Sequence, residues 1–369
     1  MKTNYEIYLE RETFDNSISN IEIPSFISKD FLFLGYIHVC KSLINVYLNQ
    51  NVNPFGKLQP LSIVEYLLNE HFYSTLGMNE EEIKKVEQNE VYQSKLFSIV
   101  VDKYFTLDHF QYHEGSFADQ FYPPITSMKL YINYILHSLK RFKQKEPKTT
   151  LLVDVIHKGL MMCNCICNLL TSGFETEAFA TWRTLHETEC VAIVLYKYGE
   201  PVIERYLKHI NYGLAFRNAL GSKEETDKLF EEFKSIMKGH GLKSKDMKRF
   251  IECGWLYAVP NILEDENFKL NYRNGTEYVA GLSEMNSYYE MSSEIAHSSP
   301  LLIYSNRKFF FYMSIVCMYE SFFRIEEILN NIFMQVMSDQ DAKSYYAVRQ
   351  TYLPQLKIIL NIEQKKIKK

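Results

Sequence analysis

One predicted helix, between Gly173 and Gly199, carries an arginine and a glutamate four residues apart, Arg183 and Glu187. At about 100° per residue, both lie on one face among apolar residues. Charged side chains are rarely buried unless paired, so one interpretation is an internal ion pair that fixes the helix register. The alternative is that Arg183 points into a cleft and binds phosphate or carboxylate, for which its planar fork is suited. His186 is close enough on the helix to reach the same pocket.

A second polar cluster lies on a predicted helix at residues 276–297. Its members follow one stripe at helical spacing: Asn286, Glu290, Ser293, Glu294 and His297. One interpretation is a solvated polar face. The other is that His297 acts as an acid or base in a cleft, since histidine changes charge near neutral pH. Glu290, Ser293 and Glu294 are then candidate binding residues beside it.

Metal ligation is the next chemistry to consider. Glu294-x-x-His297 is half of a di-iron carboxylate signature, but no second such pair stands on a suitable helix. Cys163, Cys165 and Cys167 alternate, and on a helix Cys165 points about 200° away from its neighbours. No further cysteine or histidine pair completes a zinc set, so the cysteines are interpreted as small core residues. We expect no metal and no cofactor.

Composition narrows the class of protein. The 369 residues include 14 Gly and 10 Pro, and so few helix breakers favour long helices. The net charge of −4 does not favour nucleic-acid binding through bulk charge. The pairs Lys140/Arg141 and Lys143/Lys145 and the tail 365–369 are interpreted as solvated basic faces. The apolar run 309–323 is interrupted by Glu320 and too short for a membrane span. A polar N-terminus and seven cysteines indicate a cytoplasmic protein with reduced thiols.

The periodicity predicts an all-α fold without strands. Expected helices cover about 28–50, 60–76, 79–105, 125–145, 148–171, 174–198, 201–220, 222–238, 276–297, 301–336 and 338–351, with an irregular lead-in over 1–27 and a loop at 258–275. Pro123 and Pro124 cannot both lie inside a helix and mark a boundary. We therefore divide the chain into an N-terminal helical region (1–122), a main helical domain (123–337) and a C-terminal helix with a basic tail (338–369).

The two polar helices together resemble a bacterial family known only as a domain of unknown function. The residues that carry the likeness are Ala178, Arg183, Thr184, Leu185, Glu187, Ser293 and His297. It covers roughly residues 125–335. That family is in turn similar to the HEPN superfamily, whose small helical bundles include RNA-cleaving toxins and phage-defence proteins. The resemblance implies a HEPN-like bundle in the main domain and a homodimer.

Active HEPN nucleases carry an arginine, often followed by asparagine, and then a histidine near a helix end. The arginine steadies the scissile phosphate and the histidine handles the proton, without a metal. Here Ser292 and Ser293 stand where arginine and asparagine would be. The resemblance therefore implies His297 as the catalytic residue, with Arg183 as a substitute arginine, oriented by Glu187, if the two helices pack together.

Two functions stay open. The first is an RNA- or nucleotide-binding protein, and its enzymatic form is a metal-independent ribonuclease in stress or phage defence. The second is a non-catalytic helical module that binds a protein partner or a small anionic ligand. Arg183 and His297 close together in an open cleft favour the first. Arg183 engaged by Glu187, with His297 remote, favours the second.

Overall fold

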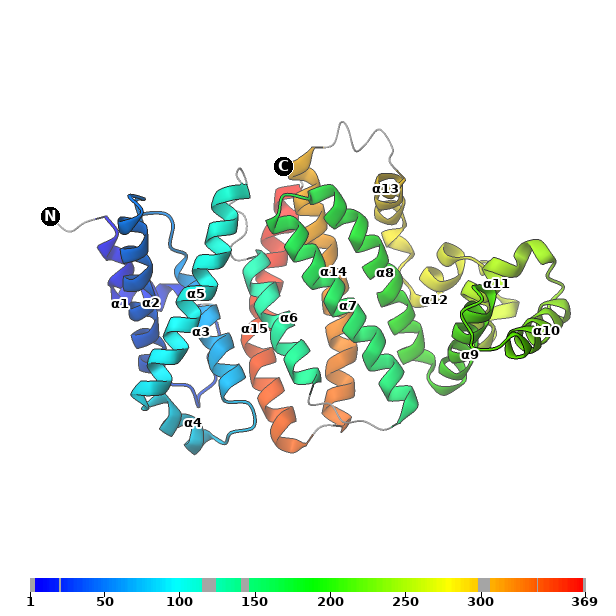
Figure 1. Cartoon of the computed structure of the whole chain (residues 1–369), viewed down its shortest axis with the longest axis horizontal. Helices are drawn as coiled ribbons and strands as arrows, with labels where there is room; N and C mark the ends of the chain where they lie inside the picture. The colour runs from blue at the N-terminus through cyan, green and yellow to red at the C-terminus, as the bar shows by residue number, and fades with distance from the viewer. Residues whose placement is uncertain are drawn as a thin grey trace.

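The structure, a computed structural model, describes residues 4–19, 21–114, 124–140, 146–297, 306–336 and 338–367. Every regular element in these ranges is helical, which confirms the predicted all-α class. Figure 1 shows the helices in a row, with the N-terminal helices at one end, a bundle of long helices in the centre and a smaller helical cluster at the other end.

The N-terminal end contains five helices. They are α1 (Arg11–Ser17), α2 (Lys29–Asn49), α3 (Pro60–Ser74), α4 (Glu80–Glu87) and α5 (Glu90–Glu114). The predicted irregular lead-in contains α1, which forms because Phe14 is fully buried in the core. The helix predicted over 79–105 is divided between α4 and α5. The side chain of Asn89 accepts a hydrogen bond from the backbone N–H of Tyr92 at 3.0 Å, and this cap starts a new helix.

Long helices form the central bundle. They are α6 (Pro124–Leu139), α7 (Pro147–Thr171), α8 (Glu175–Tyr198), α14 (Arg307–Val336) and α15 (Asp339–Ile367). Gly159 allows α7 and α14 to approach closely, because a Cβ there would lie 2.7 Å from Ile325 Cδ1. One hydrophobic core runs from the N-terminal helices through this bundle.

The last helix is longer than predicted. The sequence places its end near residue 351, with a frayed tail, but α15 continues through Pro354 to Ile367. Tyr352, Leu356 and Ile359 are buried on both sides of the proline, and their packing outweighs the hydrogen bond that proline removes. Glu363, in the predicted tail, is only 2% exposed.

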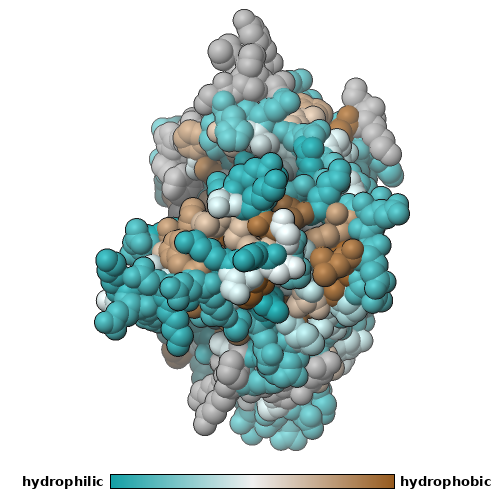
Figure 2. Space-filling model, turned by 90° about the vertical axis from the view of Figure 1, so that its right-hand side faces the viewer, coloured by the Kyte–Doolittle hydropathy of each residue, from teal (hydrophilic) through white to brown (hydrophobic). Residues whose placement is uncertain are grey.

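The smaller cluster consists of α9 (Glu200–Phe216), α10 (Lys223–Gly239) and α11 (Met247–Cys253). It has its own small core, which contains Tyr212, Phe233 and Phe250. Apolar side chains also reach the surface of α9, among them Ile210 and Phe216. Figure 2, which views this end of the molecule, shows brown apolar patches broken up by hydrophilic residues.

Short elements connect this cluster back to the bundle. They are the π-helical turn η6 (Tyr272–Glu277), α12 (Tyr278–Ala280) and α13 (Asn286–Ala296). The single helix predicted over 276–297 is therefore interrupted, because Gly281 adopts a left-handed φ of 78° that ends α12. Segment α13 then packs along α8, as seen in Figure 1.

Among the described residues, two helices are long and apolar enough to cross a membrane, namely α2 and residues 148–171. In these two, 50% and 44% of the apolar window is buried within the protein. Core helices of soluble proteins meet the same criteria, so this finding does not decide between the two environments. The cytoplasmic location stays a prediction.

The domain boundary was predicted at Pro123-Pro124, and residues 115–123 lie outside the described residues. The three-part division of the chain also stays a prediction.

Candidate functional site

Arg183 and Glu187 form the predicted pair on α8, with Arg183 Nε 3.3 Å from a Glu187 carboxylate oxygen. Tyr289 of α13 completes the cluster. Its hydroxyl donates to Glu187 Oε1 at 2.6 Å, and the Arg183 guanidinium lies 5.1 Å from its ring centre. The two charged side chains are 29% and 37% exposed, so the pair lies at the edge of the core rather than sealed inside it. Arg183 is therefore engaged by a carboxylate and an aromatic face.

His297 lies away from this pair. It is exposed at the end of α13, eight residues beyond Tyr289, or about 12 Å along the helix axis. Among the described residues, no polar side-chain contact joins His297 to Arg183 or Glu187. The structure thus brings Arg183 and Glu187 together with Tyr289, and leaves His297 two helical turns away. The catalytic role of His297 stays a prediction.

The other candidate residues of α13 face outward. Glu290 and Glu294 are exposed and Ser293 is half-buried. Glu290 pairs with Arg273 of the π-helical turn η6. Together with His297, these side chains form a largely solvated stripe, and the structure brings none of them into contact with Arg183.

His186 takes a different place from the one that the sequence indicated. It is fully buried, and it turns into the core instead of toward Arg183. Its Nδ1 lies 2.5 Å from Glu189 Oε1 and its Nε2 lies 2.8 Å from Glu277 Oε1. The ring stacks on Trp182 at 5.1 Å between centres. His186 therefore links α8 to η6.

A buried charge network surrounds this histidine. Arg324 of α14 donates to both oxygens of Glu189, at 2.8 and 3.2 Å, and Ser321 donates to Glu189 Oε1 at 2.8 Å. Burial lowers the pKa of His186, but contacts with Cys190, Glu189 and Glu277 outweigh it and raise the pKa to about 11. Burial favours the neutral form of Glu189, but His186 and Arg324 outweigh it and hold the pKa below its usual value. Two cations thus balance two carboxylates.

The sequence interpretation missed this network. Its one available signal was the spacing of Trp182, His186, Glu189 and Cys190, which places them on one face of α8. Their partners come from distant segments that the helical pattern cannot bring together. The network holds α8 against its neighbours, and all of its carboxylates are engaged.

The cysteines follow the predicted sides of α7. Cys163 and Cys167 are buried and Cys165 is exposed, which confirms that only two of the three share a face. Within the part of the chain that the structure describes, no group of three histidine, cysteine or carboxylate residues is placed to hold a metal ion.

A cavity of about 830 Å³ opens between the N-terminal helices and the bundle. Its walls come from α3, α5, α6 and α7, which lie side by side in Figure 1. The lining includes Lys129, Asn133 and His137 of α6, Lys140 directly after α6, and His157 of α7. The sequence predicted that Lys140 lies on a solvated basic face, and in the structure it also lines the cavity.

The α6 wall supplies the positive charge. Lys129 and Lys140 are eleven residues apart, which returns a helix to the same face after about three turns. Lys129 Nζ donates to the neutral amide oxygen of Asn168 at 2.8 Å. Among the described residues, neither lysine forms an ion pair with a carboxylate. Both charges are therefore available to a ligand.

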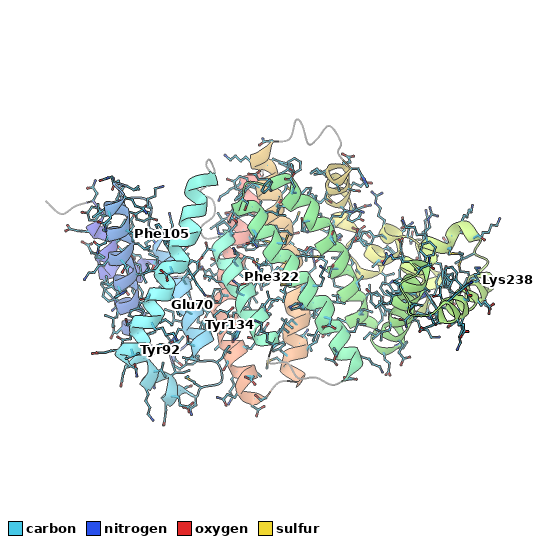
Figure 3. All side chains as sticks on the ribbon, viewed as in Figure 1. Glu70, Tyr92, Phe105, Tyr134, Lys238 and Phe322 are labelled. Carbon is cyan, nitrogen blue, oxygen red and sulfur yellow. The ribbon has the colours of Figure 1, made fainter. Side chains whose placement is uncertain are left out.

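The α3 wall is polar and largely buried. Glu70 of α3 pairs with Lys103 of α5 at 2.5 Å, so these two charges neutralise each other. Asn69 is 1% exposed and donates from Nδ2 to Glu70 Oε1 at 3.4 Å. Its Oδ1 accepts no hydrogen bond from the described residues. Figure 3 labels Glu70 on this wall and Tyr134 on the neighbouring helix α6.

The region around α8 and α13 matches a protein-family model. Residues 152–309 match a family of unknown function, DUF5677. The match confirms the predicted likeness to a domain of unknown function, over the segment that contains Arg183, Glu187 and His297. It leaves out α3, α5 and α6, which form three walls of the cavity. No curated protein and no solved structure matches the chain.

Proposed function

We propose that the protein is a non-catalytic helical module that binds a small anionic ligand in the cavity between α3, α5, α6 and α7. The observation that carries this proposal is that Lys129 and Lys140 line the cavity while no described carboxylate pairs with them. The cavity volume of about 830 Å³ suits a metabolite-sized ligand, since such sites measure about 300–1,000 Å³.

The charge balance of the walls supports an anion rather than a cation. Glu70 and Lys103 neutralise each other, and Asp102 also lines the cavity, so the three lysines of the described lining exceed its two carboxylates by one positive charge. A partly enclosed site strengthens the attraction of this charge for an anion, because fewer water molecules screen it. Arg183 is less suited to this task, since an anion would have to displace Glu187.

The other expectations from the sequence remain predictions. They are the HEPN-like arrangement, binding of RNA or a nucleotide, metal-independent ribonuclease activity, a protein partner and a homodimer. The ribonuclease requires Arg183 and His297 to act on one phosphate, and the two helical turns between Tyr289 and His297 do not favour this.

Thermal unfolding with sodium pyrophosphate, compared with sodium chloride at equal ionic strength, tests the proposal. A ligand that binds only the folded state raises the unfolding temperature, by an amount that grows with its concentration. We expect this rise in the wild type and in Lys238→Met, an exposed lysine at the far end of the molecule (Figure 3). The double variant Lys129→Met/Lys140→Met should lose it. An equal rise in the double variant, or no rise with pyrophosphate, phosphate or citrate, would overturn the proposal.

A further inference from the structure

The two free cations stand at opposite ends of the cavity. Lys129 contacts Asn168 of α7, whereas His157 lines the cavity eleven residues earlier on the same helix. Since α6 and α7 are antiparallel neighbours, Lys140 lies toward the His157 end (Figure 1). His137 also lines the cavity, one turn before Lys140. The positive charges are therefore separated by about 16 Å along the axis of α6.

The α3 wall contains a buried hydrogen-bond acceptor. Asn69 Oδ1 is buried and accepts no hydrogen bond from the described residues. Its orientation is fixed by Glu70, because exchanging the amide oxygen and nitrogen would turn an oxygen toward the carboxylate. A buried acceptor without a donor costs about 1–3 kcal/mol. A ligand hydroxyl or N–H recovers this free energy if the Asn69 side chain turns toward the cavity that the residue lines.

We infer that the ligand carries two anionic groups, one for each end of the cavity, and a hydroxyl or N–H donor for Asn69. This inference rests on the proposed function. The lysine ammonium is a point charge that binds phosphate and carboxylate alike, so the shared chemistry is a hydroxylated bis-anion. Its two sources are a sugar bisphosphate and a sugar dicarboxylate. The helix positions of the two lysines lie about 16 Å apart, which is the upper limit for the distance between the ligand's two charged groups. Because lysine side chains are flexible, they also reach the ends of a shorter ligand.

Calorimetric titration tests the two-ended arrangement. The probes are fructose 1,6-bisphosphate and glucarate, which have two charged ends, and glucose 6-phosphate and inorganic phosphate, which have one. We expect at least one two-ended probe to bind the wild type about tenfold or more tighter than either one-ended probe, or about 1.4 kcal/mol. Lys129→Met and Lys140→Met should each remove that advantage, and Lys238→Met should keep it.

Asn69 is tested with two bisphosphates, one that carries hydroxyl donors and one that carries none, and each is compared between the wild type and the variant. Asn69→Leu should weaken binding of fructose 1,6-bisphosphate by about tenfold, the value of one hydrogen bond, and leave 1,6-hexanediol bisphosphate unchanged. If both ligands lose affinity equally in a folded variant, the assigned role of Asn69 is overturned. The lysine variants change side chains at the surface, so they keep the test decisive if Asn69→Leu does not fold.

The outcomes separate the inference from the proposed function. One-ended probes that bind as tightly as two-ended ones, with binding that depends on one lysine, would overturn the inference and leave the anion site standing. No binding of any of the four probes would overturn the proposed function and the inference with it. Preference for glucarate over the bisphosphate identifies carboxylates as the charged groups, and the reverse identifies phosphates.

Discussion

Helices α8 and α6 both carry charged residues on a face that meets other helices, but they use them in opposite ways. On α8, Glu187 is engaged by Arg183, and Glu189 by His186 and Arg324. On α6, Lys129 and Lys140 line a cavity with no carboxylate partner among the described residues. A charged stripe on a helix is therefore structural where distant segments supply its counter-charges, and available for binding where they do not.

The largest expected effect tests the structural role of the α8 network. Arg324→Ala leaves the fully buried Glu189 without one of its two cations. Breaking a buried pair from one side costs about 3–5 kcal/mol, so the free energy of unfolding in urea should fall by that amount. Arg217→Ala, which changes an exposed arginine at the end of α9, should have little effect. Equal losses in both variants would mean that the network does not hold the core.

The second prediction concerns Glu65, which joins α3 to α6 and α15. Glu65 of α3 is buried and accepts hydrogen bonds from Ser127 of α6 and Gln355 of α15. Burial raises its pKa from 4.5 to about 8, although Ser127 and Gln355 lower it in part. The folded state therefore holds this proton more tightly than the unfolded state, and the stability it gives is lost as pH rises from 4.5 to 8.

Unfolding in urea across this pH range measures the effect. The wild type should lose stability relative to Glu65→Gln as pH rises, by on the order of 2 kcal/mol or more. The variant keeps the size of the side chain but has no proton to release. Parallel stability curves for the two proteins would contradict the assignment of a protonated Glu65.

Arg183→Ala should have a smaller effect than Arg324→Ala. Arg183 loses a partly exposed ion pair, worth about 0.3–0.5 kcal/mol, and a cation–π contact with Tyr289, worth about 0.5–1 kcal/mol. We expect a loss near 1 kcal/mol in urea unfolding. A loss of about 3 kcal/mol would show that Arg183 belongs with the buried network and would erase the difference between the two arginines.

The smallest effect on stability is expected for His297→Ala, since the side chain is exposed and the change should stay within about 0.5 kcal/mol. The same variant tests the ribonuclease prediction. Purified wild type and variant are incubated with cellular RNA, with and without EDTA. Cleavage that survives EDTA and disappears in His297→Ala would show that α13 carries an active site, and binding at α6 would then not be the only function of these charged helices.

The sequence predicted the fold class and most long helices because their periodicity is local information. The ends of α7, α8 and α10 lie within two residues of expectation. The prediction failed where a single side chain, or a contact with a residue distant in sequence, determines where a helix begins or ends. Asn89 restarts the chain as α5, Gly281 ends α12, and buried neighbours carry α15 past Pro354.

The site was harder to predict than the fold. The spacing of Arg183 and Glu187 correctly gave their pairing, but it contained no information on Tyr289. His186 points into the core because Glu277, ninety-one residues away, accepts its second N–H. The cavity requires four separate helices, α3, α5, α6 and α7, to pack together, so from the sequence alone the basic residues of α6 looked like a solvated face.

The most direct test of the central claim is calorimetric titration of pyrophosphate into three proteins. They are the wild type, Lys129→Met/Lys140→Met and Arg183→Met. We expect the wild type and Arg183→Met to bind with the same affinity, and the double lysine variant to lose binding by tenfold or more, about 1.4 kcal/mol. Binding that survives in the double lysine variant and disappears in Arg183→Met would place the anion site on α8 and contradict the account.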